Sequence, residues 1–311
     1  MIQKVIPVFF CLILGCYLQV PAQPKPDSTI QIGQKYIQLS EVVVSNQLNI
    51  PVFIERIKND TSFYKAFRNL RVLNYSAIND VRMLNKSGES VATLFSKTRQ
   101  LRENNCRRME VIEQQVTGDY FDEEGEPAYY TAEMYAGLFF TKGLICGESN
   151  IVAGKSFTTE GKSGMEKHKE QLKMLFFNPG KRISGLPFMS SKTAIYDEEL
   201  ADLYDMKVDM DAYNGASCYI FSQKVKPGKE GEVVVDSMTT WLNDKTFEMV
   251  ARTYSLSYSA GVYDFDVTME VQLTHAAGLL VPSLIRYTGN WKALFKRREN
   301  GVFTATLYDF K

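Results

Sequence analysis

The sequence contains few of the residues, and none of the short motifs, that usually carry catalysis. Only 2 of its 311 residues are histidine, the commonest general base, and neither His168 nor His275 stands in a catalytic pattern. The motifs Gly-x-Ser-x-Gly, Gly-x-x-x-x-Gly-Lys and His-Glu-x-x-His, typical of serine hydrolases, P-loop proteins and zinc proteases, do not occur. We therefore expect a protein that is not an enzyme and that needs no cofactor.

Neither sign of charge is in excess, because 36 lysine and arginine residues balance 36 aspartate and glutamate residues. A nucleic-acid-binding protein has a clustered basic excess, so we expect no nucleic-acid partner. The densest basic stretch consists of Lys292, Lys296, Arg297 and Arg298. It is either an ordinary exposed strand end or a docking surface for anionic headgroups or an acidic partner, which leaves peripheral membrane contact open.

Long apolar runs are also missing beyond the N-terminus. Residues 1–22 combine a single base, no acid and an apolar run over residues 5–15 that is too short for a membrane span, which is typical of a secretory signal peptide. Two processing routes are open: cleavage after Ala22, or lipidation of Cys16 at the end of the lipobox-like run Ile13-Leu14-Gly15-Cys16. We expect an exported protein, periplasmic or associated with the outer membrane in a Gram-negative-type envelope.

Five cysteines are present, and two of them, Cys11 and Cys16, lie in the expected signal peptide. The other three, Cys106, Cys146 and Cys218, allow one disulfide and one remaining thiol. We expect a Cys106–Cys146 disulfide, and three buried free thiols are the alternative. No two of the three have Cys-x-x-Cys spacing, so the sequence predicts neither a redox-active pair nor a metal site.

The sequence is rich in alternating apolar and polar side chains. Over residues 264–274 the alternation is unbroken, and a period of two places one face of a strand in an apolar interior. Turn sequences such as Asn300-Gly301 separate the neighbouring segments. The last third of the chain therefore predicts six consecutive antiparallel strands, at residues 218–226, 232–243, 247–258, 264–275, 281–297 and 301–310.

The earlier part of the chain mixes helices with strands. Residues 50–58 and 61–70 have the spacing of short amphipathic helices, whereas residues 129–145 are compatible with either a strand or a helix. A capping box that starts at Ser163 opens another helix, and Asp197 caps a shorter one that includes Tyr204. Further strands are predicted at residues 37–44, 72–84, 91–101 and 106–121.

One hairpin resembles a known family. The run Thr240-Trp241-Leu242-Asn243-Asp244-Lys245-Thr246, followed by Met249-Val250-Ala251-Arg252, resembles the x-W-x-D-x-x-T hairpin of the lipoprotein-carrier and outer-membrane lipoprotein-sorting (LolA/LolB-like) superfamily. The run Gly278-Leu279-Leu280-Val281-Pro282 is similar to the G-x-x-x-P turn of that family. The likeness covers residues 217–310 and, more loosely, 61–121, whereas residues 122–216 have no counterpart in it.

The resemblance implies an α+β fold with a strongly curved antiparallel sheet. This sheet would be an open half-barrel of about 10–12 strands covered by a few short helices. We expect one domain over residues 36–311, preceded by a flexible leader at 23–35 and carrying a helical or loop insertion around 147–216. A domain boundary inside residues 154–164 is the alternative.

Ten apolar side chains of the last strands share one face of this sheet. Such a face is either a solid core or the wall of a cavity that something else fills. The resemblance implies a cavity for a lipid or a lipidated protein, with the helices at 50–58 and 61–70 as a lid. The residues expected to bind the ligand are Tyr254, Leu256, Tyr258, Phe265, Val267, Met269, Val271, Ile285, Tyr287 and Trp291.

These features predict a non-enzymatic exported envelope protein that binds a hydrophobic ligand in a half-barrel cavity. A secreted scaffold or interaction protein with a solid core and no ligand is the alternative. A carboxylate-dependent hydrolase is a third hypothesis, because Asp264, Asp266 and Glu270 share one face of a strand. Alternate acids on a strand, however, usually form only its solvent-facing side.

Overall fold

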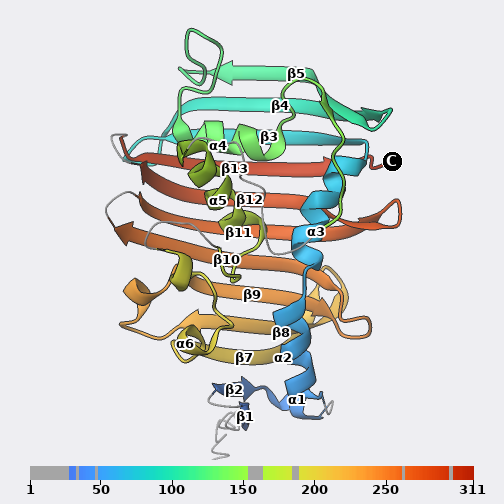
Figure 1. Cartoon of the computed structure of the whole chain (residues 1–311), viewed down its shortest axis with the longest axis vertical. Helices are drawn as coiled ribbons and strands as arrows, with labels where there is room; N and C mark the ends of the chain where they lie inside the picture. The colour runs from blue at the N-terminus through green and yellow to red at the C-terminus, as the bar shows by residue number, and fades with distance from the viewer. Residues whose placement is uncertain are drawn as a thin grey trace, which may run out of the picture.

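One open sheet of 13 strands dominates the described part of the chain (Figure 1). The computed structural model describes residues 28–32, 35–45, 48–152, 164–183, 189–260, 263–293 and 297–311. In these residues the strand order is β1-β2-β7-β8-β9-β10-β11-β12-β13-β3-β4-β5-β6. Because β1 and β6 lie at opposite ends of this order, the sheet does not close on itself. The predicted signal peptide, its cleavage site after Ala22 and Cys16 lie outside the described residues.

The six predicted C-terminal strands are confirmed and form an antiparallel meander. Each strand pairs with its neighbour in sequence, from β8 to β13. The strands are β8 (Ala216–Val225), β9 (Val235–Asn243), β10 (Met249–Ala260), β11 (Tyr263–Ala276), β12 (Leu279–Ala293) and β13 (Glu299–Tyr308). Between β11 and β12 the two turn residues, Ala277 and Gly278, have φ of 49° and 74°, as a tight type I′ hairpin requires.

The turn expected at Asn300-Gly301 is wrong, because both residues lie inside β13. Asn300 pairs with Asn290 and Gly301 with Gly289 of β12. A Cβ added to Gly301 would come within 3.1 Å of the Thr131 side chain. The glycine therefore allows a helix to approach the strand closely and does not form a turn.

The strands of the first half join the meander at its C-terminal strand. β13 pairs with β3, which places an N-terminal strand beside the end of the chain, and β4, β5 and β6 follow in order. These strands are β3 (Tyr75–Leu84), β4 (Ser90–Glu103), β5 (Cys106–Thr117) and β6 (Ile145–Cys146). The predictions at residues 72–84, 91–101 and 106–121 are thus confirmed as strands, except that Leu70–Val72 is a short 3-10 helix.

Three local predictions at the other end of the sheet are wrong. Residues 28–32 of the expected flexible leader form β1 (Ser28–Ile32), which pairs with β2 (Lys35–Leu39). The strand predicted over 37–44 ends with β2, and helix α1 (Glu41–Ser45) follows it. Tyr204 does not belong to a helix but begins β7 (Tyr204–Tyr213), a sheet strand within the expected insertion. Tyr204, Met206 and Val208 are buried and alternate with polar residues, which is a strand period.

The sheet is mixed rather than purely antiparallel, because β2 and β7 run parallel. The other described pairs are antiparallel. Parallel neighbours need a long crossover connection. The chain between β2 and β7 supplies one, since its described residues include six α-helices and four strands of the same sheet.

Short helices cross one face of the sheet, the face turned toward the viewer in Figure 1. The two helices predicted at residues 50–58 and 61–70 are confirmed, and the ambiguous segment 129–145 contains a helix. Asn49 caps α2 as its position suggests, accepting a hydrogen bond from the Val52 amide at 3.2 Å. The helices are α2 (Ile50–Asn59), α3 (Ser62–Asn69), α4 (Tyr130–Phe139), α5 (Gly164–Phe177) and α6 (Glu198–Ala201), with 3-10 turns at Ser190–Lys192 and Glu230–Glu232.

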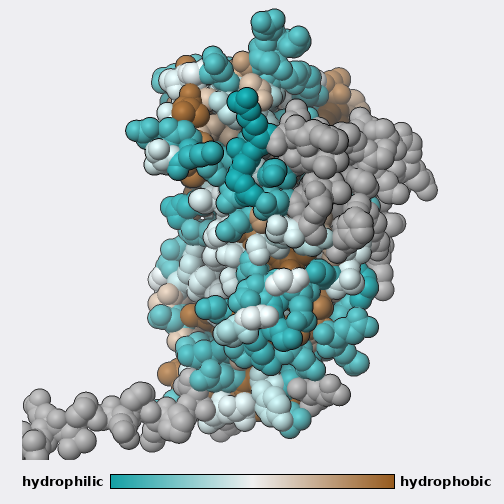
Figure 2. All heavy atoms as spheres, turned by 90° about the vertical axis from the view of Figure 1, so that its left-hand side faces the viewer, coloured by the Kyte–Doolittle hydropathy of each residue, from teal (hydrophilic) through white to brown (hydrophobic). Residues whose placement is uncertain are grey.

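The core lies between this layer of helices and the sheet. Met269 of β11 sits opposite Tyr254 on one neighbouring strand and Tyr287 on the other, and all three are at most 2% exposed. On the face drawn in Figure 2 the surface is mostly hydrophilic, with apolar residues in separate patches. The large apolar side chains on the helix-covered face of β10, β11 and β12 are buried.

Replacing Met269 with alanine should lower the free energy of unfolding by about 2–5 kcal/mol, because its removal leaves a gap among close-packed aromatic rings. Chemical denaturation of the purified protein measures the loss. Val111, which is 57% exposed on β5, is the matched control, and its alanine variant should change stability by only about 0.5 kcal/mol. Equal effects of the two substitutions would contradict a tightly packed core at Met269.

Candidate functional site

The ten side chains predicted to bind a ligand share one face of the sheet and are buried. They come from the adjacent strands β10, β11 and β12, and none is more than 8% exposed. Cross-strand pairing brings Leu256 opposite Val267 and Val271 opposite Ile285, so the side chains form one continuous apolar surface.

Side chains of the protein itself cover this surface. The ring of Phe63 from α3 lies 6.2 Å from that of Tyr254, and Phe176 from α5 lies 6.1 Å from both Tyr287 and Trp291. The Tyr254 hydroxyl donates a hydrogen bond of 2.5 Å to the Phe176 carbonyl, which fixes the last turn of α5 on the sheet. Burial raises the pKa of Tyr254 well above its ordinary value, so the hydroxyl stays a donor. The hollow expected here is filled by α3 and α5.

An unfilled cavity of about 100 Å³ lies beside this surface, between α3, the end of α4 and the end of α5. Its lining combines aromatic and aliphatic residues with four cationic ones, Arg68, Arg71, Arg107 and Lys173, which define its rim. The apolar lining residues are Tyr64, Phe67, Leu70, Tyr75, Leu138, Phe139, Phe140 and Phe177. None of the ten predicted residues lines it.

Aromatic contacts connect the cavity to the ten-residue surface. Phe177 in the cavity wall lies 4.8 Å from Phe67, which lies 5.4 Å from Phe63. Phe63 in turn contacts Tyr254 on the sheet. The cavity therefore adjoins a continuous layer of packed aromatic rings that runs under α3 and α5.

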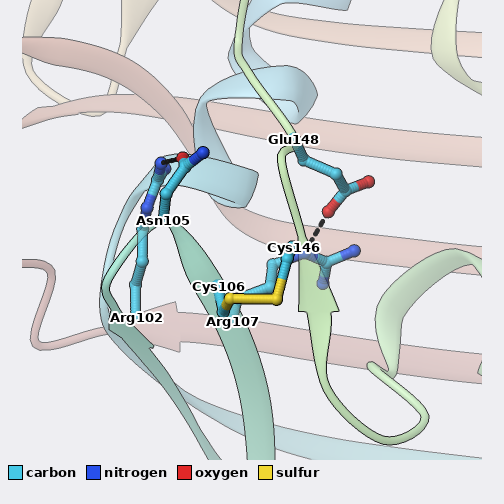
Figure 3. The surroundings of a disulfide bond; sticks show 6 residues. All are labelled: Arg102, Asn105, Cys106, Arg107, Cys146 and Glu148. Atoms are coloured by element: carbon cyan, nitrogen blue, oxygen red, sulfur yellow. Dashed lines mark hydrogen bonds and ion pairs between the residues drawn. A yellow bond between two sulfur atoms is a disulfide. The ribbon is translucent and has the colours of Figure 1, made fainter.

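At the rim of the cavity one carboxylate holds two arginines. Glu148 Oε1 lies 2.9 Å from Arg71 Nη1. Glu148 Oε2 lies 2.5 Å from Arg107 Nε, and Figure 3 shows this second pair. Arg107 also donates to Gln100 Oε1 at 3.1 Å and to the Thr141 hydroxyl. Burial alone raises the pKa of Glu148, but the hydrogen bond from Arg107 and the arginine charges outweigh it and hold the pKa below its ordinary value.

A disulfide anchors the segment that carries Glu148. Cys106 and Cys146 are bonded, joining β5 to the two-residue strand β6, and Glu148 follows two positions later (Figure 3). The Gly147 amide donates to the Asn105 carbonyl at 3.0 Å. Further along, the Ser149 carbonyl accepts from Arg68 at 2.8 Å, so residues 146–149 are held across the rim from both ends. The third thiol, Cys218, is free and buried.

Other candidates from the sequence are engaged in ion pairs on exposed positions. Asp264 pairs with Arg298, and Glu270 pairs with Arg286 at 3.0 Å. Burial would raise the pKa of Glu270, but hydrogen bonds from Gln272 and Arg286 hold it below its ordinary value, which is opposite to what a general acid needs. Asp266, the third acid of the hydrolase hypothesis, is exposed on the same strand.

The remaining candidate residues form no shared site. His275 lies 3.4 Å from Glu248 at an exposed strand end. The side chain of His168 and all of Lys296 lie outside the described residues. Among the residues that the structure describes, no cluster of His, Cys, Asp and Glu suits a metal ion, and no helix is long and apolar enough to cross a membrane.

The sequence did not point to Arg71, Arg107 or Glu148. Glu148 is 77 residues from Arg71 and 41 from Arg107, and the three side chains stand on a 3-10 turn, a strand and a loop. The one usable signal was the expected Cys106–Cys146 bond, because it brings the neighbouring residues Arg107 and Glu148 together.

Removing the disulfide should destabilise the protein substantially. It closes a loop with a sequence separation of 40, for which chain entropy gives roughly 3–4 kcal/mol. The double variant Cys106→Ser/Cys146→Ser should therefore melt at a lower temperature than the wild type, and dithiothreitol should shift the wild type toward the variant. The double variant is also the control for the reductant, because dithiothreitol should leave its melting temperature unchanged. A lower melting temperature of the variant in dithiothreitol would contradict the assignment of the shift to the Cys106–Cys146 bond.

The Glu148 ion pairs should make stability depend on acidity. A folded-state pKa below the ordinary value of 4.5 means that the pairs stabilise the fold fully above that value and that this contribution is lost as the pH falls through the folded pKa. The difference in melting temperature between the wild type and Glu148→Gln should be largest near pH 7 and should shrink toward pH 3. A difference independent of pH would contradict an ionised Glu148.

Comparison with known proteins places the chain beside a small group of solved structures. No protein-family model and no curated protein matches it. One similar solved structure is a DUF1329 family protein from Desulfovibrio piger, with 13% identity over 81% of this chain and 93% of that chain and a TM-score of 0.25. A putative outer membrane lipoprotein-sorting protein domain from Vibrio parahaemolyticus has 10% identity over 80% of this chain and 91% of that chain, with a TM-score of 0.27. A LolA superfamily protein from Nitrosomonas europaea has 8% identity over 80% of this chain and 91% of that chain, with a TM-score of 0.23. The last two carry the name of the superfamily that the hairpin at residues 240–252 resembles.

Proposed function

We propose that this chain is a non-enzymatic envelope protein that binds a hydrophobic ligand, a lipid or the acyl chain of a lipidated protein, beneath α3 and α5 in the hollow of a half-barrel. The observation that carries the proposal is the cavity lined by aromatic residues, whose Phe67 and Phe177 connect through ring contacts to the apolar layer of the sheet. Ligand sites are typically concavities that combine apolar side chains with polar groups at defined positions. Eight of the fourteen residues that line this cavity are aromatic or aliphatic, and polar atoms make up the larger share of its exposed lining.

The cavity by itself accommodates only part of an acyl chain. Its volume of about 100 Å³ is below the roughly 300–1,000 Å³ of most ligand sites. A longer chain would take the place of the last turn of α5, whose Leu172, Leu175 and Phe176 are at most 1% exposed. The ten side chains from Tyr254 to Trp291 would then contact the ligand instead of α5. In this proposal α5, together with α3, is the lid.

The proposed location is outside the cytoplasm. Residues 1–22 would direct export, followed either by cleavage after Ala22 or by lipidation at Cys16. Lipidation would tether the protein to a membrane, whereas cleavage would release it into the periplasm. Either state allows peripheral contact with the membrane from which a hydrophobic ligand is taken.

A scaffold with a solid core and no ligand is the second candidate. The burial of all ten predicted side chains beneath the protein's own helices favours it. The two candidates differ in whether α5 leaves the sheet when an amphiphile is added.

Binding of a fluorescent fatty-acid probe, together with lipid extraction and native mass spectrometry of the purified protein, tests the proposal. Gly137 lines the cavity, and a Cβ placed there meets only the flexible end of Lys173, at 3.1 Å. Gly137→Phe should therefore fill the cavity and weaken probe binding at least about tenfold, whereas Gly137→Ala should bind as the wild type does. Absence of both co-purifying lipid and probe binding would leave the scaffold as the better account.

A further inference from the structure

The rim of the cavity is built for an acidic group. Four cationic side chains line the cavity, and the residues lining it include no carboxylate. Arg68 Nε is buried and has no hydrogen-bond partner within the described residues, although Arg68 Nη2 bonds to the Ser149 carbonyl. A buried guanidinium donor that is left unpaired is costly, and a ligand that supplies an acceptor removes that cost.

Arg71 lies in an environment that disfavours its charge. Burial lowers the pKa of Arg71, the charge of neighbouring Arg68 lowers it further, and Glu148 acts in the opposite direction. Four cationic side chains paired with the one negative charge of Glu148 leave a net positive charge, which attracts a further anion. The guanidinium forks present paired donors, which suit a carboxylate or a phosphate.

Glu148 does not line the cavity itself, but its carboxylate pairs with two residues that do, Arg71 and Arg107. Each of its oxygens accepts from a different arginine, and residues 146–149 hold it there from outside the cavity. Glu148 stands on a loop outside the sheet, so a head group that takes its place at the arginines displaces a side chain and no strand. Arg71 and Arg107 thus already hold one carboxylate between them.

We propose that the cavity binds the carboxylate of a long-chain fatty acid, and that Glu148 is an internal counter-ion which the ligand's head group replaces at Arg71 and Arg107. This rests on the proposed function, and it adds the class of ligand and the residues that recognise its head. The first methylenes of the chain lie against Phe67, Phe139 and Phe177, and the rest follows the aromatic contacts under α5.

The test compares binding of palmitate and hexadecanol, which share a chain and differ in head-group charge, by isothermal titration of the full protein. Palmitate should bind at least about tenfold more tightly. Glu148→Gln removes the competitor and should strengthen palmitate binding several-fold, whereas Arg71→Gln/Arg107→Gln should weaken it about tenfold or more. Hexadecanol binding should stay within about twofold in every variant.

The exposed pair of Arg82 and Asp80 provides matched controls. These residues lie 2.6 Å apart on β3, away from the lining of the cavity, so Asp80→Asn and Arg82→Gln should leave palmitate binding unchanged. Should the double arginine variant fail to fold, Glu148→Gln and a salt series on the wild type still decide. Raising the NaCl concentration should weaken palmitate binding but not hexadecanol binding.

Two further ligands separate the sources of negative charge. Acetate should compete only weakly, because it lacks the chain, and palmitoyl lysophosphatidic acid should bind more weakly than palmitate. Tighter binding of the lysophosphatidic acid would overturn the carboxylate assignment in favour of a phosphate head. Equal binding of palmitate and hexadecanol, with no response to Glu148→Gln, would overturn the inference and leave the proposed function standing. Failure of every amphiphile to bind would remove both.

Discussion

The structure depends on covering one apolar face of a very wide, open sheet. The 13 strands offer far more surface than the few short helices occupy, and an apolar face left in water would associate with other molecules. Over β10, β11 and β12 the cover is a single layer of aromatic contacts, in which Phe63 and Phe176 bridge from the helices to Tyr254, Tyr287 and Trp291. Whether this layer stays in place decides between a solid core and the proposed binding site.

Buried arginines are the second constraint on the same side of the sheet. Arg252 is 5% exposed and is held by the Thr240 hydroxyl at 3.0 Å and by the face of the Phe63 ring, 4.7 Å from its guanidinium carbon. Arg107 is instead held by a carboxylate, and a charge buried with a charged partner is destabilised strongly when that partner is removed. The disulfide next to Arg107 keeps this partner in place, and so couples the covalent structure of the loop to the electrostatics of the cavity.

Alternation made most of the sheet predictable, because a strand with one buried face imposes a period of two on its sequence. The helices at 50–58 and 61–70 were equally clear from their spacing. β7 was missed because the N-cap signal at Asp197 was extended through Tyr204, although Met206 and Val208 continue a strand pattern. The parallel pairing of β2 with β7 was beyond reach, since it depends on where distant parts of the chain meet.

The candidate site was predictable only in part, for the same physical reason. The ten apolar residues follow from the period of adjacent strands, and all of them do share a buried face. What covers that face is decided by α5, whose contact with the sheet includes a hydrogen bond to a backbone carbonyl that no side-chain pattern reveals. The rim of the cavity joins Arg71, Arg107 and Glu148 from three separate elements, so no local pattern contains it.

The packed core is compatible with the proposed ligand if the acyl chain makes the apolar contacts that the end of α5 loses when it moves. Moving the end of α5 uncovers Leu172, Leu175 and Phe176, and at about 1.5–3 kcal/mol for each side chain this costs roughly 5–9 kcal/mol. Each methylene of an acyl chain that takes their place contributes about 0.8 kcal/mol. Roughly 6–11 methylenes are therefore needed only to offset the free energy lost when the end of α5 leaves the sheet. Short fatty acids have too few methylenes to displace α5, whereas long-chain ones have enough. A core that is solid without ligand is thus what selective binding of long-chain amphiphiles requires.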